Sequence, residues 1–441
     1  MPNTDKIFRD PLYNYVAVDR GRDGWLVDLI DSPEIQRLRR IHQLGVSHFT
    51  YPGADHSRFS HTLGVLHLMQ HACRRVEVLE QGPRVERARH LLLAAAVLHD
   101  VGHGPFSHLF EPALGIDHED WSCKIISCPQ GSIQQKLAEN DIPVEQVIAL
   151  IQKDNHQRPP WQKTLLSSEL DVDRIDYLRR DSYFTGAGYG HFDWYRILNS
   201  FTLHTTGDRF DILVWPSAAM YPIEEYIFSR FYMYNAVYQH KTTRGFELLV
   251  RAAWKRAREL SGQGSDAYLV HEIAEFLNAG QPTVQQYLAM EDATLVYQMQ
   301  VWMRHPDRVL SDLARRFLVR DRFAALEDPV SQIAFPDLRD AWEKALGDKV
   351  AEHGFEPEYY ALRDDLKLTV YNPYLPEKEE PEQDPYNAIF VQPDPRDKPR
   401  EISTILTRLA PVTGAREKRY RYYVPRECRD AVRTLADSRK W

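Results

Sequence analysis

Apolar residues recur with helical spacing along much of the chain, and one run is apolar on every face. Residues 91–98 read Leu-Leu-Leu-Ala-Ala-Ala-Val-Leu, which predicts a helix buried in the protein core. Helical spacing also marks residues 26–44, where Ser32 and Pro33 form a helix-start signal, and residues 58–67. The pattern favours a mostly helical fold.

The same pattern continues beyond this region with one β interruption. Acidic and apolar residues follow helical spacing over 169–181. Residues 201–203 and 210–215 are short apolar runs on either side of a turn sequence, which indicates a small β hairpin. We expect one long, nearly unbroken helix over 223–260 and further helices to about residue 351.

Composition changes near residue 374, where prolines and acidic residues become dominant. Such a segment is typical of an exposed linker or lid. The tail beyond it has a strand pattern followed by a helical one, so we predict a peripheral C-terminal α+β region. The expected divisions are an N-terminal arm at 1–25, a helical core at 26–260, a helical C-terminal region at 261–373, an acidic proline-rich linker or lid at 374–399 and an α+β tail at 400–441.

The overall composition is that of a globular protein, with 43% hydrophobic and 27% charged residues among 441. A formal charge of −8 argues against a surface that coats nucleic acid, although a local basic pocket for a phosphorylated ligand is compatible with it. The four cysteines are too few for a disulfide framework. Without a signal-peptide pattern or a membrane-length apolar run, we expect a cytoplasmic protein with no membrane contact.

The buried helix at 91–98 leads directly into His99 and Asp100, and two interpretations of this end are open. A divalent metal would bind His99 through nitrogen and Asp100 through oxygen, and it would offset the high cost of burying their polarity. Alternatively, Gly102 ends the helix and His99 lies at the negative end of its dipole.

Residues elsewhere in the chain favour the metal. His61 begins another helix and residues 171–176 supply acids, so two imidazoles and two carboxylates are available for one divalent ion: Mn, Fe, Co, Ni, Zn or Mg. Histidines suited to acid–base chemistry near neutral pH follow at His103, His108 and His118. Positive charge for a polyphosphate is offered by Arg58, Arg174 and Arg230.

Several motifs occur in a fixed order along the chain. They are Gln-Leu-Gly (43–45), Tyr-Pro-Gly-Ala-Asp-His-Ser-Arg-Phe-Ser-His (51–61), His-Asp-Val-Gly-His-Gly-Pro-Phe-Ser-His (99–108), Asp-Val-Asp-Arg-Ile-Asp-Tyr-Leu-Arg-Arg-Asp (171–181) and Tyr-Gln-His-Lys (238–241). Over about residues 6–260 the chain therefore resembles the HD superfamily of metal-dependent phosphohydrolases, and within it the deoxynucleoside triphosphate triphosphohydrolases. The resemblance implies an HD-domain helical core.

The resemblance also assigns roles to individual residues. It implies metal ligation by His61, His99, Asp100 and Asp173. Asp171 is the alternative to Asp173. It implies catalytic roles for His103, His108, Glu111 and His118, and His118 is the candidate acid for the departing 5′-oxygen. The residues it assigns to the substrate are Gln43, Leu44, Arg58, Arg174, Tyr177, Asp181, Arg230 and Tyr238.

The implied reaction is hydrolysis of a deoxynucleoside triphosphate (dNTP) to the deoxynucleoside and inorganic triphosphate, with Tyr238 excluding the 2′-hydroxyl of a ribonucleotide. The resemblance further implies a homo-oligomer, dimeric or tetrameric, with an activating nucleotide near Lys6, Asp31, Gln36 and Arg39. Arg39 and Asp31 could equally form a structural ion pair. Two alternatives stay open: an HD enzyme acting on another phosphate ester or on single-stranded nucleic acid, and a nucleotide-sensing assembly protein with little turnover.

Overall fold

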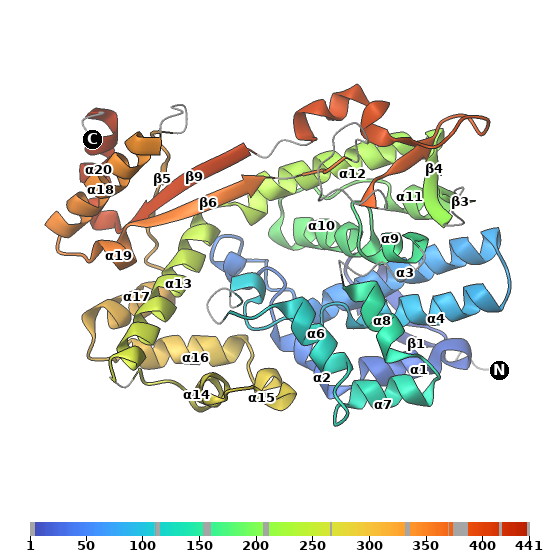
Figure 1. The fold of residues 1–441 in the computed structure, drawn as a ribbon, viewed down its shortest axis with the longest axis horizontal. Coiled ribbons are helices and arrows are strands. Elements are labelled where there is room, and N and C mark those ends of the chain that lie inside the picture. Colours follow the sequence, from blue (N-terminus) through green and yellow to red (C-terminus); the bar gives the residue numbers. More distant parts are fainter. Residues whose placement is uncertain are drawn as a thin grey trace.

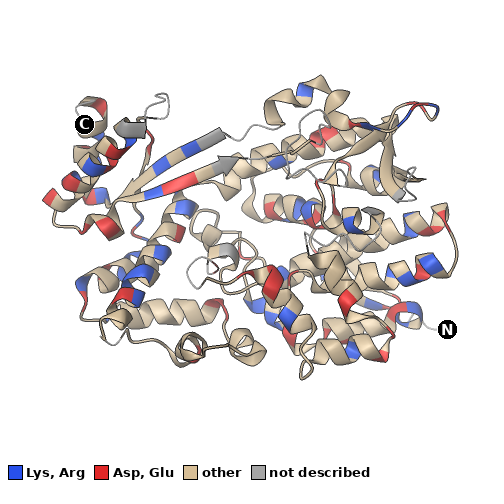
Figure 2. Ribbon diagram, in the orientation of Figure 1, with Lys and Arg blue, Asp and Glu red and all other residues tan. Residues whose placement is uncertain are grey.

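A computed structural model describes residues 5–109, 111, 115–152, 160–205, 211–264, 267–330, 336–368, 370–373, 387–413 and 417–438. Within these ranges the fold is mostly helical with small sheets (Figure 1), which confirms the predicted fold class. Lys and Arg are interspersed with Asp and Glu along the helices (Figure 2). None of the described helices is both long and apolar enough to cross a lipid bilayer.

The helices follow one another along the chain as α1 (Arg20–Ile30), α2 (Pro33–Arg37), α3 (Arg58–Leu79), α4 (Pro83–Leu98), α6 (His118–Ile126), α7 (Ser132–Glu139), α8 (Val144–Ile151), α9 (Pro160–Leu166), α10 (Val172–Thr185), α11 (Trp194–Ser200), α12 (Met220–Met233), α13 (Lys241–Gly262), α14 (His271–Asn278), α15 (Val284–Leu288), α16 (Asp292–Trp302), α17 (Arg308–Leu318), α18 (Pro336–Glu352), α19 (Pro357–Tyr360) and α20 (Arg429–Ser438). Two short 3₁₀ turns also line the site described below, η2 (Gly45–Phe49) and η3 (Ser107–Leu109).

The centre of the N-terminal half is built from α3, α4 and α10. Both α4 and α10 pack against α3 (Figure 1). Every residue from Leu91 to Leu98 in α4 is buried, which confirms the prediction from its apolar pattern. Ser32 and Pro33 occupy the N-cap and first position of α2, as predicted. The local sequence signals therefore place the helices that surround the site.

The nearly unbroken helix expected over 223–260 is divided into two helices by a break in its middle. α12 ends at Met233, a π-helical turn covers Tyr234–Tyr238, and α13 begins at Lys241. His240 has extended backbone angles, and its ring nitrogen accepts the Thr242 N–H as an N-cap. The local side-chain cap competes with helix propagation at this point.

The strands are β1 (Lys6–Asp10), β2 (Asn14–Val18), β3 (Thr202–Thr205), β4 (Asp211–Pro216), β5 (Ala324–Glu327), β6 (Leu362–Leu368), β7 (Phe390–Gln392), β8 (Arg400–Glu401) and β9 (Glu417–Val424). β1 and β2 form an antiparallel hairpin where an extended N-terminal arm was expected. β3 and β4 form the predicted hairpin, and its turn at 206–210 lies outside the described residues.

The C-terminal segments add to two sheets. β7 pairs parallel with β4, and the buried Ile389 and Val391 anchor it there, so the exposed-linker prediction fails for this stretch. Residues 374–386 lie outside the described part of the chain. β9 lies between β5 and β6, and α20 follows β9, which confirms the strand-then-helix pattern of the tail. The sequence pattern did not predict β5 or β6.

Candidate metal centre and nucleotide cavity

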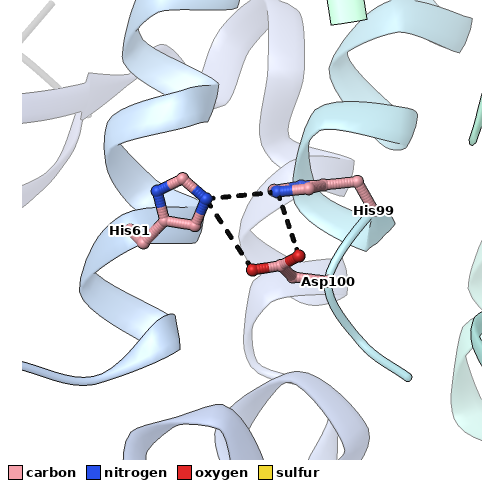
Figure 3. Close-up of side chains that lie close together, drawn as sticks. All are labelled: His61, His99 and Asp100. Carbon is pink, nitrogen blue, oxygen red and sulfur yellow. Dashed lines mark hydrogen bonds and ion pairs between the residues drawn. The ribbon is translucent and has the colours of Figure 1, made fainter. Parts of the chain in front are cut away.

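The ends of α3 and α4 bring three predicted ligands together (Figure 3). His61 lies in the first turn of α3, His99 is the C-cap of α4 and Asp100 follows it. The Nε2 atoms of the two histidines are 3.3 Å apart. Asp100 places Oδ1 3.4 Å from His99 Nε2 and Oδ2 3.7 Å from His61 Nε2. Four polar atoms thus converge on one point.

Asp173, in the first turn of α10, is positioned as the fourth member. Its Oδ1 lies 2.9 Å from His61 Nε2 and 3.7 Å from His99 Nε2. The alternative, Asp171, is the N-cap of α10 and accepts the backbone N–H groups of Ser168 and Arg174, each at 2.7 Å. Burial raises the pKa of Asp171 to about 7. The geometry favours Asp173 as the ligand and a capping role for Asp171.

This donor set fits a divalent ion. Burial opposes the ionisation of Asp100, but Arg58, His99 and His103 hold its pKa well below the usual range, so the carboxylate is charged. Two imidazole nitrogens and two carboxylates suit a mid-series divalent metal. When bound, such a metal lowers the pKa of a coordinated water and polarises a phosphoryl oxygen.

Asp176 orients His61, and the sequence reasoning did not identify it. Its Oδ2 lies 2.8 Å from His61 Nδ1. Arg180 donates to both oxygens of Asp176 at 2.8 and 3.0 Å, and the Tyr13 hydroxyl donates at 2.9 Å. A carboxylate on the far nitrogen fixes the tautomer and orientation of a ligating histidine. The signal was available, since Asp176 follows Asp173 by one helical turn.

Replacing Asp176 by asparagine should weaken metal binding by roughly 10- to 100-fold, the usual effect of losing such a partner. The amide keeps the shape of the side chain but loses the charge that holds the His61 ring. Metal titration of the chelator-stripped protein measures the affinity. Asp28→Asn, at an exposed position of α1, is the matched control. Equal affinities for Asp176→Asn and the wild type would show that Asp176 does not support the ligand.

A second group of ionisable side chains lies beside the metal centre. The rings of His103 and His118 stack with centroids 4.0 Å apart. Glu111 places Oε1 2.9 Å from His118 Nδ1 and 3.6 Å from His103 Nδ1. Burial, together with the nearby Arg58, lowers the pKa of His103 well below its usual value, so its imidazole is neutral at pH 7. The side chain of His108, in η3, lies outside the described residues.

The guanidinium of Arg58 forms two hydrogen bonds beside the candidate metal centre. Its Nη1 donates to Asp100 Oδ2 at 2.5 Å and its Nε donates to Ser107 Oγ at 2.8 Å. By contrast, Arg174 and Arg230 both approach one carboxylate oxygen of Glu169, at 3.5 and 2.5 Å. Ser107 and Glu169 were not singled out from the sequence.

A cavity of about 520 Å³ opens from the metal centre. Its lining includes all of the predicted substrate-binding residues: Gln43, Leu44, Arg58, Arg174, Tyr177, Asp181, Arg230 and Tyr238. The buried Asp181 is central among them, because the Tyr238 hydroxyl donates to its Oδ2 at 2.8 Å and His56 Nε2 lies 2.8 Å from its Oδ1. The Tyr238 ring also contacts Tyr177 edge-to-face.

The four residues considered for an activator lie apart from the cavity lining. Gln36 and Arg39 are joined, because Arg39 Nε donates to Gln36 Oε1 at 2.7 Å. The guanidinium of Arg39 stacks over the Phe59 ring. Arg39 thus pairs with Gln36 and not with Asp31, which is the C-cap of α1, while Lys6 lies on β1.

Comparisons with known proteins show the family of the chain. A profile of the HD domain matches residues 58–181, the segment that contains the four predicted ligands. The chain is 35% identical over 432 residues to the uncharacterized protein YwfO of Bacillus subtilis, covering 96% of this chain and 93% of that protein. It superimposes on a crystal structure of a phosphohydrolase from Bacteroides thetaiotaomicron with a TM-score of 0.78 at 27% identity, covering 96% and 100% of the two chains. The chain belongs to the HD-domain phosphohydrolases.

More distant relatives have an assigned substrate class. The HD-domain phosphohydrolase is 26% identical over 311 residues to the deoxynucleoside triphosphate triphosphohydrolase SAMHD1 of Gallus gallus, a match covering 62% of this chain and 49% of that protein. It is 29% identical over 269 residues to the Dictyostelium discoideum SAMHD1 homolog, covering 58% and 50%. The phosphohydrolase therefore matches only about half the length of either relative.

Proposed function

We propose that this protein hydrolyses dNTPs to the deoxynucleoside and inorganic triphosphate. The observation that carries the proposal is the group formed by Asp181, Tyr238 and Gln43 beside the metal centre. Asp181 is a buried carboxylate that holds the Tyr238 hydroxyl. Gln43 Oε1 is buried and has no hydrogen-bond partner among the described residues. Asp181 and Gln43 therefore offer acceptors for the 3′-hydroxyl of a sugar.

The side chain of Tyr238 would exclude ribonucleotides from this site. Its hydroxyl is fixed by Asp181, and its ring is held against Tyr177. Because both its hydroxyl and its ring are held, Tyr238 cannot move aside for the 2′-hydroxyl of a ribonucleotide. That hydroxyl would lose its bound water against the ring and gain no hydrogen-bond partner. The sugar of a deoxynucleotide has only hydrogen at that carbon.

Two arginines of the cavity lining offer positive charge to the triphosphate of the substrate. Arg174 and Arg230 both line the cavity. They share the carboxylate of Glu169, which is not part of the lining, and Arg174 Nε also lies 3.3 Å from Asp171 Oδ2. Guanidinium groups bind phosphate oxygens through paired N–H donors. Arg58, which holds Asp100, adds charge nearest the metal ligands.

The leaving 5′-oxygen needs a proton, and His118 is the candidate donor. Glu111 contacts its Nδ1, which leaves Nε2 as the nitrogen to face the substrate. His103 is neutral and stacked behind it, so it positions the His118 ring. A positioned imidazole of this kind typically contributes about 10²- to 10⁴-fold to such a step.

Two features remain part of the proposal. A nucleotide near Gln36 and Arg39 would regulate activity, and it would act between subunits of a homo-oligomer. The rival functions are an HD-type hydrolysis of another phosphate ester or of single-stranded nucleic acid, and nucleotide sensing with little turnover. The complete donor set favours an enzyme over a sensor.

The test is chromatography of the products after incubation with Mn²⁺ and each dNTP, singly and mixed. ATP and a single-stranded oligonucleotide are incubated in parallel. We expect deoxynucleoside and intact triphosphate, with ATP unchanged, and activity confined to the mixture would indicate an activator. Survival of all four dNTPs while the oligonucleotide is cut would instead support the nuclease.

A further inference from the structure

A buried carboxylate of the C-terminal helical region joins two loops of the site. Asp292 is the first residue of α16, and its side chain is buried. Its Oδ2 accepts the backbone N–H of His42 at 2.8 Å and also contacts Nδ1 of the His42 ring. Its Oδ1 accepts the backbone N–H of Phe106 at 2.6 Å. One side chain thus holds the Gln43 loop (residues 41–45) and the HD loop (residues 103–107), both distant from it in the sequence.

The two loops also contact each other along the wall of the cavity. Gly45 has a φ of +52°, and a Cβ atom there would lie 2.9 Å from the Phe106 carbonyl oxygen. Ser107 Oγ donates to the His42 carbonyl at 2.9 Å. Both loops contribute residues to the cavity lining, whereas Asp292 lies behind them and does not line the cavity. Asp292 therefore acts on a ligand only through the two loops.

The backbone of the HD loop needs a partner to keep its conformation. Phe106 and Ser107 have φ values of +50° and +56°, in the left-handed region that residues with a Cβ atom rarely adopt. Such a backbone persists only where the surrounding structure holds it. The Asp292 carboxylate holds the Phe106 N–H, and the Ser107 hydroxyl is bound to the Gln43 loop.

The contacts of Asp292 require a carboxylate and not an amide. The His42 N–H, the Phe106 N–H and the His42 ring all donate to it, and the ring contact raises the pKa of His42. A carboxylate offers acceptors on both oxygens. Asparagine would keep the shape but turn an amino group toward one of these donors, and a buried donor without an acceptor is costly. Asp292→Asn therefore removes hydrogen bonds without removing volume.

Neighbouring residues reinforce the same connection. The Tyr287 hydroxyl donates to the Gly102 carbonyl at 2.6 Å. The buried Arg37 donates to the carbonyls of His103 at 2.9 Å and Met290 at 2.7 Å. The end of α15 and the start of α16 thus support the site from outside the cavity.

We propose that Asp292 is a positioning residue that sets Gln43 for the 3′-hydroxyl of the substrate. Its hydrogen bonds to His42 fix the residue directly before Gln43, whose buried Oε1 has no partner among the described residues. Its hydrogen bond to Phe106 fixes the loop that follows the predicted ligand Asp100. The sugar and the α-phosphate of one nucleotide reach both loops, so the separation of the loops must match the ligand. The inference rests on the proposed dNTP hydrolysis and adds to it a residue outside the HD-domain match.

The test compares kcat/KM for each dNTP with that for the matching 2′,3′-dideoxynucleotide, which lacks the 3′-hydroxyl. The proteins are the wild type, Asp292→Asn and the control Asp340→Asn, at an exposed position of α18. The wild type should prefer the dNTP by about 10- to 100-fold, because the analogue leaves a buried acceptor unpaired. Asp292→Asn should reduce this ratio to about threefold or less by raising KM for the dNTP. Asp340→Asn should retain the ratio, and a variant that merely loosened the fold would lower kcat/KM for both substrates together.

A second variant covers the case in which Asp292→Asn does not fold. His42 is half-buried, and His42→Ala removes only the ring contact while both backbone hydrogen bonds to Asp292 remain. We expect it to lose part of the ratio. An unchanged ratio in folded Asp292→Asn, or in His42→Ala where Asp292→Asn does not fold, would refute the positioning role.

A binding measurement separates this inference from the proposed function. Calorimetric titration with the four 2′-deoxynucleosides and their 2′,3′-dideoxy counterparts needs no turnover. If dNTPs are hydrolysed but the 3′-hydroxyl preference is absent or survives in Asp292→Asn, the inference is wrong and the hydrolysis stands. If no dNTP is hydrolysed yet deoxynucleosides bind with a 3′-hydroxyl preference that Asp292→Asn removes, the positioning role stands and the proposed reaction is wrong. Absence of both hydrolysis and this preference would refute both.

Discussion

Replacing His99 by alanine should abolish turnover and remove the metal while the protein remains folded. His99 contributes its Nε2 to the donor set (Figure 3), and among the described residues its other ring nitrogen contacts only the Ala96 carbonyl. Its removal therefore leaves no buried charge without a partner. A divalent metal provides several kcal/mol of transition-state stabilisation, so we expect kcat to fall by at least about 10³-fold.

Elemental analysis and steady-state kinetics on the same preparation measure both effects. His90→Ala, at a half-exposed position of the same helix, is the control and should keep its metal and activity. Turnover near the wild-type rate in His99→Ala would refute the metal assignment. Normal metal content with lost turnover would place His99 outside the ligand set.

Asp100→Ala should give the same loss of turnover with a second, distinguishable defect. Arg58 is almost fully buried and donates to Asp100. Removing one partner of a buried ion pair costs about 3–5 kcal/mol, because the other charge remains buried. The two variants therefore differ in urea-unfolding midpoint although they share the catalytic defect.

Local signals were enough to predict the elements that carry the ligands. The apolar run at 91–98 predicted a buried helix, and Ser32 with Pro33 predicted the start of α2, because both depend on residues a few positions apart. The order of the histidines and aspartates then predicted a donor set, and the structure brings those residues close together. Together, the local sequence pattern and the family resemblance predicted most of the residues that form the candidate metal centre.

The features that the sequence did not predict depend on contacts distant in the chain. β7 pairs with β4 across about 175 residues, so no local pattern indicates that strand. Asp176 is recognised as a partner only once α10 lies against α3. The bend before α13 depends on one side-chain cap at His240, where helical periodicity continues on both sides and predicts no interruption.

The glycine at position 102 serves helix packing and does not form a left-handed helix cap. A glycine after a helix suggests a left-handed cap, yet Gly102 does not adopt a positive φ. Its role is a close approach to α6, the helix that begins at His118. A Cβ atom on Gly102 would lie 2.1 Å from the His118 carbonyl oxygen and 2.2 Å from the Ser122 nitrogen, both backbone atoms.

Gly102→Ala should therefore destabilise the protein and separate the catalytic histidines. Backbone atoms of α6 cannot rotate away, so the helix must move and carry His118 from its contacts with His103 and Glu111. Overpacking of this kind costs roughly 3 kcal/mol, and losing a positioned acid lowers kcat by about 10²-fold or more.

Gly262→Ala, at the end of α13 with open space around its Cα, is the matched control and should behave like the wild type. Urea unfolding measures the first effect and steady-state kinetics the second. Wild-type stability in Gly102→Ala would mean that α6 does not pack on this glycine, and normal kcat in a destabilised variant would remove His118 from the proposed proton transfer.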